Sequence, residues 1–198
     1  ELFSRVILAL PARALEKIAT GLPGDRPFAP LSELEHSPIT VVSLGYRRQD
    51  IGHPLDGFGL LVPALENRQI LGVIFVSSLF PGRAPDGHVA LTVMFGGSRQ
   101  RSLCTLSPEK IQTLAESELR QMLGASGAPV FCRQRTWPAA IPQYNLGFEK
   151  FKNTIESAEK RFPGLFVAGT VHDGISVPLA LLSGLRTAGK CLESRPSG

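Results

Sequence analysis

The sequence has few of the residues that build disulfide or metal frameworks. Its 198 residues include three cysteines, Cys104, Cys132 and Cys191, and four histidines. The cysteines are odd in number and share no CxxC spacing, and the histidines show no metal-ligand spacing. These patterns argue against a disulfide framework and against a metal site, and they predict inert thiols in a reducing compartment.

Common catalytic motifs are absent as well. The sequence contains no HExxH, GxSxG or Walker motif, and no close pair of acidic residues of the kind that glycosidases use. It also has no GxGxxG after a strand, so the chain lacks its own grip on the phosphates of a dinucleotide. We therefore predict no acid–base catalytic residue in this chain.

Long apolar runs and clusters of charge are missing too. No apolar run reaches the ~18 residues that a membrane span needs, and no signal peptide opens the sequence. Lys and Arg number 21 against 17 Asp and Glu, and the net charge of +4 is scattered, which argues against nucleic-acid binding. These observations predict a cytoplasmic protein, with peripheral attachment to the inner face of the membrane left open.

What is present is the composition of a folded domain, with 43% hydrophobic and 19% charged residues. Four short strand-like segments follow one another at 39–46, 58–62, 70–76 and 89–95, with turn residues and no helical pattern between them. This order predicts an antiparallel sheet. Helices are predicted at 107–124, which begins with Ser107-Pro108 and ends at Gly124, and at 148–162.

The most apolar segments lie toward the two ends of the chain. Residues 6–10 form a continuous apolar run, typical of a strand covered on both faces, and its place so near Glu1 suggests a chain cut from a longer one. A strand at 165–169 is followed by a polar turn that ends at Gly174, and then by a helix at 176–190. Because that helix is apolar on most faces, we predict that it is buried.

Three places could hold a ligand, and each also has a purely structural explanation. The turn at 170–174 and the helix start at Ser176 would offer free N–H groups to an electron-rich atom, or form an ordinary connection. The segment 137–144 holds the single tryptophan, Trp137, and would present aromatic surface to a flat ligand or act as a packed connector. Strand alternation places Met94 away from the core, where Leu61 and Ile74 would join it in lining an apolar cavity unless helices cover both faces.

Several segments, in order and at matching spacing, resemble the oxygen-dependent, FAD-containing protoporphyrinogen oxidases of the flavin-containing amine oxidoreductase superfamily. They are DGFGLLVP at 56–63, SLFPGRAP at 78–85, TVMFGG at 92–97, AIPQY at 140–144, and LFVAG at 165–169 with the turn to Gly174. The resemblance extends from about Val6 to Lys190. It concerns the C-terminal part of that family, whose members begin with a strand and the GxGxxG that binds FAD.

The resemblance implies a mixed α+β and α/β fold, in which an antiparallel substrate sheet with helices accompanies the C-terminal strand–helix part of a Rossmann-like FAD domain. Residues 1–19 would be a return segment of the FAD-binding domain, and residues 20–135 the substrate-binding domain. Residues 136–164 would form a connecting helical segment, and residues 165–198 the C-terminal part of the FAD-binding domain.

The resemblance also implies the site residues and the reaction. Contacts to FAD would come from Trp137, Gly169, Thr170, Gly174, Ile175, Ser176 and Val177, and contacts to substrate from Leu61, Ile74 and Met94. The implied reaction is the oxidation of protoporphyrinogen IX to protoporphyrin IX in haem biosynthesis, with molecular oxygen as the acceptor. The family's arginine that pairs with a substrate propionate lies upstream of the matching segment.

The implied partners are protoporphyrinogen IX, molecular oxygen and the missing N-terminal half of the enzyme, while membrane contact and a homodimer are left open. Two other interpretations also stay open. The chain could belong to another flavin oxidoreductase that acts on an amine or a polyene, or it could be a non-catalytic module that binds a tetrapyrrole or a partner protein. The 198-residue chain alone is predicted not to hold FAD, because it lacks the GxGxxG.

Overall fold

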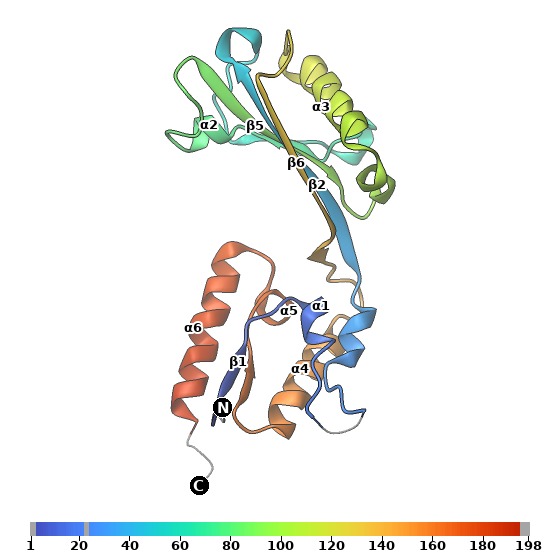
Figure 1. Cartoon of the computed structure of the whole chain (residues 1–198), viewed down its shortest axis with the longest axis vertical. Coiled ribbons are helices and arrows are strands. Elements are labelled where there is room, and N and C mark those ends of the chain that lie inside the picture. Colours follow the sequence, from blue (N-terminus) through green and yellow to red (C-terminus); the bar gives the residue numbers. More distant parts are fainter. Residues whose placement is uncertain (1–2, 22–23, 195–198) are drawn as a thin grey trace. The chain divides into compact units, whose positions relative to one another are not determined.

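The computed structural model describes residues 3–21 and 24–194, which form two compact units (Figure 1). Residues 37–140 make up the sheet unit, and residues 1–36 with 141–198 make up the terminal unit. The family resemblance implied divisions at 19/20, 135/136 and 164/165. Residues 20–36 instead belong to the terminal unit, because Phe28, Leu31 and Leu34 pack in its core. The outermost residues of the first and last predicted segments lie outside the described part of the chain.

The sheet unit is built on a five-stranded sheet in the order β3-β4-β5-β2-β6. The strands are β2 (His36–Arg47), β3 (Gly59–Leu61), β4 (Gly72–Ile74), β5 (His88–Gly96) and β6 (Phe131–Pro142). The pairs β2–β5, β4–β5 and β3–β4 are antiparallel, which confirms the sheet predicted from four apolar segments. The connections carry the short helix α2 (Val76–Leu79) and the 3-10 turns η2 (Arg48–Asp50), η3 (Ala64–Glu66) and η4 (Arg101–Thr105).

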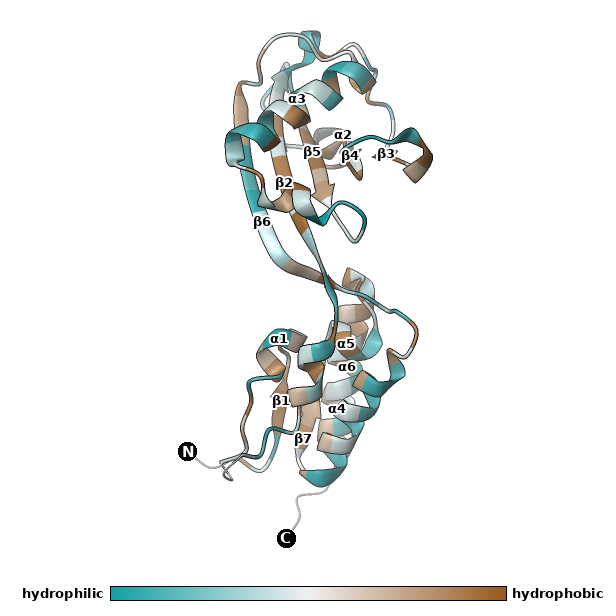
Figure 2. Cartoon of the chain, turned by 90° about the vertical axis from the view of Figure 1, so that its right-hand side faces the viewer, coloured by the Kyte–Doolittle hydropathy of each residue, from teal (hydrophilic) through white to brown (hydrophobic). Residues whose placement is uncertain are grey.

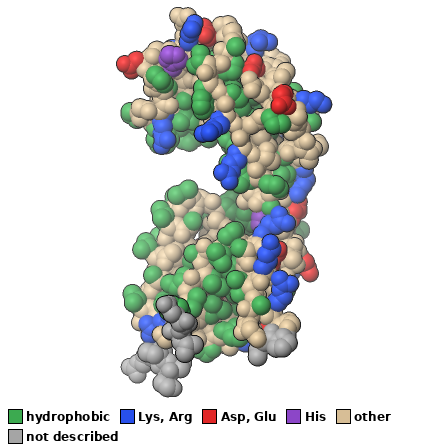
Figure 3. Space-filling view, viewed as in Figure 1, with side chains coloured by type: hydrophobic (Ala, Val, Ile, Leu, Met, Phe, Trp, Pro, Cys, Tyr) green, Lys and Arg blue, Asp and Glu red, His purple; other side chains and the backbone are tan. Residues whose placement is uncertain are grey.

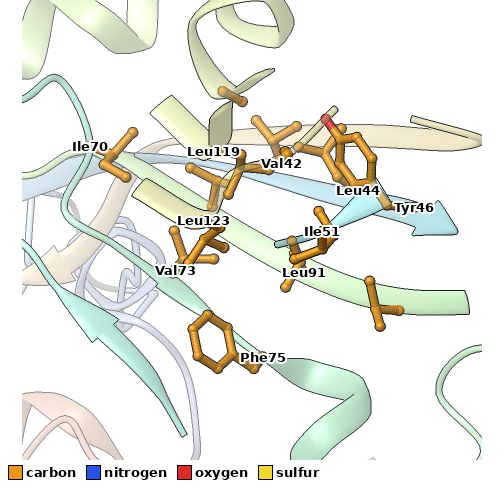
Figure 4. Close-up of a cluster of buried hydrophobic side chains, with 14 of the residues drawn as sticks. Val42, Leu44, Tyr46, Ile51, Ile70, Val73, Phe75, Leu91, Leu119 and Leu123 are labelled. Atoms are coloured by element: carbon orange, nitrogen blue, oxygen red, sulfur yellow. The ribbon is translucent and has the colours of Figure 1, made fainter. Parts of the chain in front are cut away.

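Helix α3 (Pro108–Leu123) covers one face of this sheet (Figure 2). It begins where the Ser107 hydroxyl accepts a hydrogen bond from the Lys110 N–H, and it ends at Gly124 in the left-handed conformation, as predicted. Every second side chain of β2 and β5 points into the core below α3, which Figure 4 shows in close-up. The core includes Val42, Leu44, Tyr46, Val73, Leu91, Val93, Leu119 and Leu123.

Strand β6 lies at the edge of the sheet, next to β2. The segment that includes Trp137 was interpreted as a stiff connector or a ligand surface, and it continues the strand as far as Pro142. Pro138 lies within the strand. An edge position tolerates this residue, because a proline lacks the N–H that a central strand must donate.

The terminal unit combines a two-stranded parallel sheet with helices. Its strands are β1 (Val6–Leu8) and β7 (Leu165–Val167), paired in register from Val6 with Leu165. Its helices are α1 (Ala12–Leu15), η1 (Ala29–Glu33), α4 (Glu149–Arg161), α5 (Thr170–Asp173) and α6 (Val177–Glu193). The core is formed by Leu15, Phe28, Leu31, Phe151, Ile155, Val167 and Val171 with their neighbours.

Two burial predictions for the terminal unit are wrong within the described residues. The strand at 6–10 was expected to be covered on both faces, but β1 is shorter and Val6 and Ile7 are each 42% exposed. The last helix was expected to be buried, but α6 turns its polar side inward: only Ser183 and Thr187 are buried. Its exposed apolar residues are Val177, Leu179, Leu181, Leu182, Leu185 and Leu192. Figure 3 shows hydrophobic side chains gathered on the surface of this unit. An apolar helix surface favours burial, but only one side of α6 packs against the rest of this unit.

None of the described helices is both long enough and apolar enough to cross a membrane.

Candidate functional site

The face of the sheet that α3 does not cover presents an apolar platform made of cross-strand rows. In one row Leu61 pairs with Gly72, Gly72 with Met94, and Met94 with Val41. In the next row Gly59, Ile74, Thr92 and Ser43 are paired in the same way. Directly paired residues project to the same face of a sheet. The register therefore brings Leu61, Ile74 and Met94 onto one surface.

This platform is accessible to a ligand. Leu61 is 83% exposed, and Ile74 and Met94 are partly exposed, whereas their sequence neighbours Val73, Val93 and Phe95 are buried. A cavity of about 540 Å³ continues along the same face. It is lined by Ser43, Gly45, Val76, Arg83, Ala90, Thr92, Val130 and Phe131, among others. Strand alternation in the sequence predicted that Met94 of β5 lies on this face. It did not predict Phe131, which belongs to β6, a strand whose pairing was not predicted.

The strand–turn–helix of the terminal unit is shaped by two glycines. Gly169 has φ +124° and Gly174 has φ +120°, conformations that other residues rarely adopt. A Cβ at Gly174 would lie 2.5 Å from Cδ1 of Leu179, while one at Gly169 would meet nothing within 4 Å. The backbone at Gly169 is therefore open to close approach, and the backbone at Gly174 is packed against α6.

Polar side chains hold this turn in place. The buried Ser183 of α6 accepts a hydrogen bond from the Gly169 N–H at 2.9 Å. The phenol of Tyr144 donates to the carbonyl of Thr170. Neither the burial of Ser183 nor the Tyr144 contact was predicted, because serine is usually an exposed residue and the tyrosine contact joins residues 26 positions apart.

The acid at the end of the turn is tied to the same network. Burial opposes ionisation of Asp173, but hydrogen bonds from Ser183 and His172 and the charge of Arg186 outweigh it and lower its pKa. The carboxylate lies 3.3 Å from Nδ1 of His172 and 3.6 Å from Nη1 of Arg186. Asp173 is thus a structural carboxylate of the turn.

The start of α6 leaves backbone donors free. Ser176 caps the helix by accepting from the Leu179 N–H at 3.3 Å. The N–H groups of Gly174, Ile175 and Ser176 donate to no acceptor among the described residues. Successive free N–H groups next to a helix N-terminus suit an electron-rich ring edge, such as the carbonyl groups of a flavin. The N–H groups of Gly174, Ile175 and Ser176 therefore fit the cofactor in donor chemistry, whereas the Gly169 N–H already donates to Ser183.

Trp137 lies in the sheet unit, on the edge strand β6. The residue is 39% exposed, and the guanidinium carbon of Arg135 lies 5.2 Å from the centroid of its ring. The predicted site residues thus form two groups. Trp137 shares the sheet unit with the three predicted substrate residues, and the glycine turn belongs to the terminal unit.

Comparisons with known proteins identify the family of the chain. The family model described as "Flavin containing amine oxidoreductase" matches residues 2–192. The mitochondrial protoporphyrinogen oxidase of Nicotiana tabacum is 36% identical over 194 residues, covering 95% of this chain and 38% of the relative. Protoporphyrinogen oxidase of Bos taurus is 34% identical and covers 97% of this chain and 41% of the relative. The chain thus spans about two fifths of the length of these curated relatives.

Solved structures share the fold at lower identity. A protein from Exiguobacterium sp. 255-15, assigned as a protoporphyrinogen oxidase, superposes with a TM-score of 0.77 at 21% identity, covering 96% of this chain and 41% of that one. A putrescine oxidase variant superposes with a TM-score of 0.67 at 17% identity, covering 95% of this chain and 42% of that one. The mixed fold with an antiparallel sheet is that of these proteins, and the chain belongs to the flavin-containing amine oxidoreductase family.

Proposed function

We propose that this chain supplies the substrate sheet and the flavin-facing turn of an oxygen-dependent protoporphyrinogen oxidase. The observation that carries the proposal is the 36% identity to a protoporphyrinogen oxidase over 95% of the chain. The apolar platform supports it, because a flat macrocycle needs a broad apolar surface rather than acid–base residues.

In this proposal bound FAD would supply the oxidising chemistry, with molecular oxygen as the final electron acceptor. The chain's own residues bind and orient. The free N–H groups of Gly174, Ile175 and Ser176 would hold the polar edge of the flavin ring, and Thr170 and Val177 would contribute from the same segment. Leu61, Ile74 and Met94 hold the macrocycle and exclude water from it.

The missing partner in this proposal is the amino-terminal half of the flavoprotein, which would supply the grip on the FAD phosphates. The exposed leucines of α6 and the half-exposed strand β1 are the apolar surface that it would cover. The 198-residue chain alone is therefore expected to lose FAD on gel filtration. A stable flavin absorbance band on the purified chain would contradict the proposal that the amino-terminal half is needed to hold FAD.

The test of the substrate assignment is Met94→Arg in the flavin-bearing holoenzyme. A cation in the middle of an apolar platform has no partner there. The rate of protoporphyrinogen IX oxidation is therefore expected to fall at least about a hundredfold, which corresponds to about 2.7 kcal/mol of activation free energy. Flavin content should stay unchanged, because Met94 lies on the sheet and not on the turn. The assay follows the fluorescence of the protoporphyrin IX formed.

The matched control is Leu65→Arg, which adds the same charge to the sheet unit at a side chain that is 92% exposed and lies on η3. It should leave turnover unchanged. Full turnover by Met94→Arg would show that the platform does not bind the substrate. An active holoenzyme that oxidises an amine but not the porphyrinogen would favour the amine-oxidase alternative, whose fold this chain shares.

A further inference from the structure

The apolar platform ends, at its β6 edge, in two arginines. Alternation along β6 places Arg133 and Arg135 on the same side as Trp137, and all three side chains are exposed. A shallow cavity of about 380 Å³ connects them to the platform. Its lining residues are Val41, Ser43, Arg133, Gln134, Arg135 and Trp137. Val41 is also the residue paired with Met94, so the arginines border the row that carries the predicted substrate contacts.

These two guanidinium groups have no acidic partner among the described residues. Other arginines of the chain do: Arg68 binds Glu118 at 2.9 Å, and Arg161 binds Asp25 at 2.8 Å. Arg135 instead packs against the ring of Trp137, which restricts its side chain without using its N–H donors. A pair of unpaired, partly oriented guanidinium groups beside an apolar surface is suited to carboxylates.

We infer that Arg133 and Arg135 bind the carboxylate side of a flat, largely apolar substrate whose ring lies on the platform. The inference rests on the proposed function and adds to it a carboxylate site within this chain. Neighbouring strands lie about 4.8 Å apart, so β6 is about 10 Å from β5, across β2. That separation places the arginines one ring's breadth from Met94. A macrocycle with propionate side chains on one side fits this surface, because its apolar ring can lie on the platform while its propionates reach the two arginines.

The experiment measures binding of protoporphyrin IX and of its dimethyl ester to the full 198-residue chain in dilute neutral detergent, through the shift of the porphyrin absorption band. Arg133→Gln and Arg135→Gln are each expected to weaken binding of the diacid about tenfold, since each removes a charge-assisted hydrogen bond. Both should leave binding of the ester unchanged. Arg135→Lys keeps the charge and should recover part of the affinity.

The matched control is Arg120→Gln, which removes the same charge from the exposed side of α3, the helix that covers the other face of the sheet. It should bind the diacid as the wild type does. If the protein attracts anions only through its general positive charge, all three variants should bind the diacid equally weakly, and that result would overturn the inference. Equal affinity of the wild type for diacid and ester would also overturn it, while leaving the substrate platform intact. Failure of the wild type to bind either porphyrin would overturn both the inference and the platform.

Discussion

Replacement of Ser183 by alanine tests whether the glycine turn depends on the inner side of α6. The hydroxyl is fully buried, accepts from the Gly169 N–H at 2.9 Å and donates to the carboxylate of Asp173. Ser183→Ala removes both bonds and leaves a backbone donor without a partner. Leaving a buried donor unsatisfied costs about 1–3 kcal/mol. Loss of the hydrogen bond to the Asp173 carboxylate adds only part of its usual energy, because His172 and Arg186 still face Asp173. We expect Ser183→Ala to lower the local stability of the turn by about 2–3 kcal/mol in total.

Hydrogen exchange measures this loss where it occurs. A decrease of about 2–3 kcal/mol in local stability speeds exchange about 30- to 150-fold in peptides that cover residues 165–175. The control is Ser157→Ala, which makes the same change at an exposed position of α4 in the same unit. It should not alter those peptides. Unchanged exchange at Gly169 in Ser183→Ala would refute the role given to the hydroxyl.

The same variant has a defined pH dependence. The pKa of Asp173 is lowered in the folded chain, so its ionisation stabilises the fold above the usual aspartate value of about 3.9, and this contribution is lost as the pH falls through the folded pKa. Ser183→Ala weakens the depression, so the variant has less of this contribution to lose. The difference in local stability between wild type and variant, measured by hydrogen exchange, should therefore become smaller as the pH falls below about 4.

Three further predictions concern single positions. Gly174→Ala should cost at least about 1–3 kcal/mol in thermal unfolding, because of its positive φ and the close approach of Leu179, whereas Gly57→Ala, in open space, should be nearly neutral. Burial, with a smaller contribution from a nearby glutamate, raises the pKa of Tyr46 to about 12, so its absorbance change on ionisation should appear near that pH. Folding stability from Tyr46 should be present below about pH 10 and be lost as the pH rises through 12. Leu185→Lys should change the free energy of unfolding of the chain alone by less than about 0.5 kcal/mol, yet weaken association with the amino-terminal half that the proposed function invokes.

Local patterns predicted most of the fold correctly. Alternation on the segments that became β2 and β5 identified both faces of the sheet, because the side-chain period of a strand is two. The cap at Ser107 and the glycine at Gly124 gave the bounds of α3. The predicted helix at 148–162 is confirmed as α4. These features depend on short-range geometry, which a single sequence contains in full.

Burial in the terminal unit could not be predicted in the same way. The leucines of α6 indicate an apolar face, but sequence alone does not tell which surface covers it or whether that surface belongs to the same chain. The residue that packs inward, Ser183, is polar because it satisfies the backbone of a turn 14 residues earlier. The register that joins Leu61 to Met94 through Gly72 is likewise a long-range property. The FAD and substrate roles of the site residues remain predictions.

The two margins of the sheet affect how the protein associates with itself. At one margin β3 has only three residues, and at the other β6 has a proline at position 138 and two cationic side chains beside it. An exposed strand recruits other chains by hydrogen bonding to its unused amide groups, and short length, proline and charge all weaken that template. Oligomers or aggregates of this polypeptide are therefore expected to form through side-chain contacts, and not by continuation of the sheet from one molecule into the next.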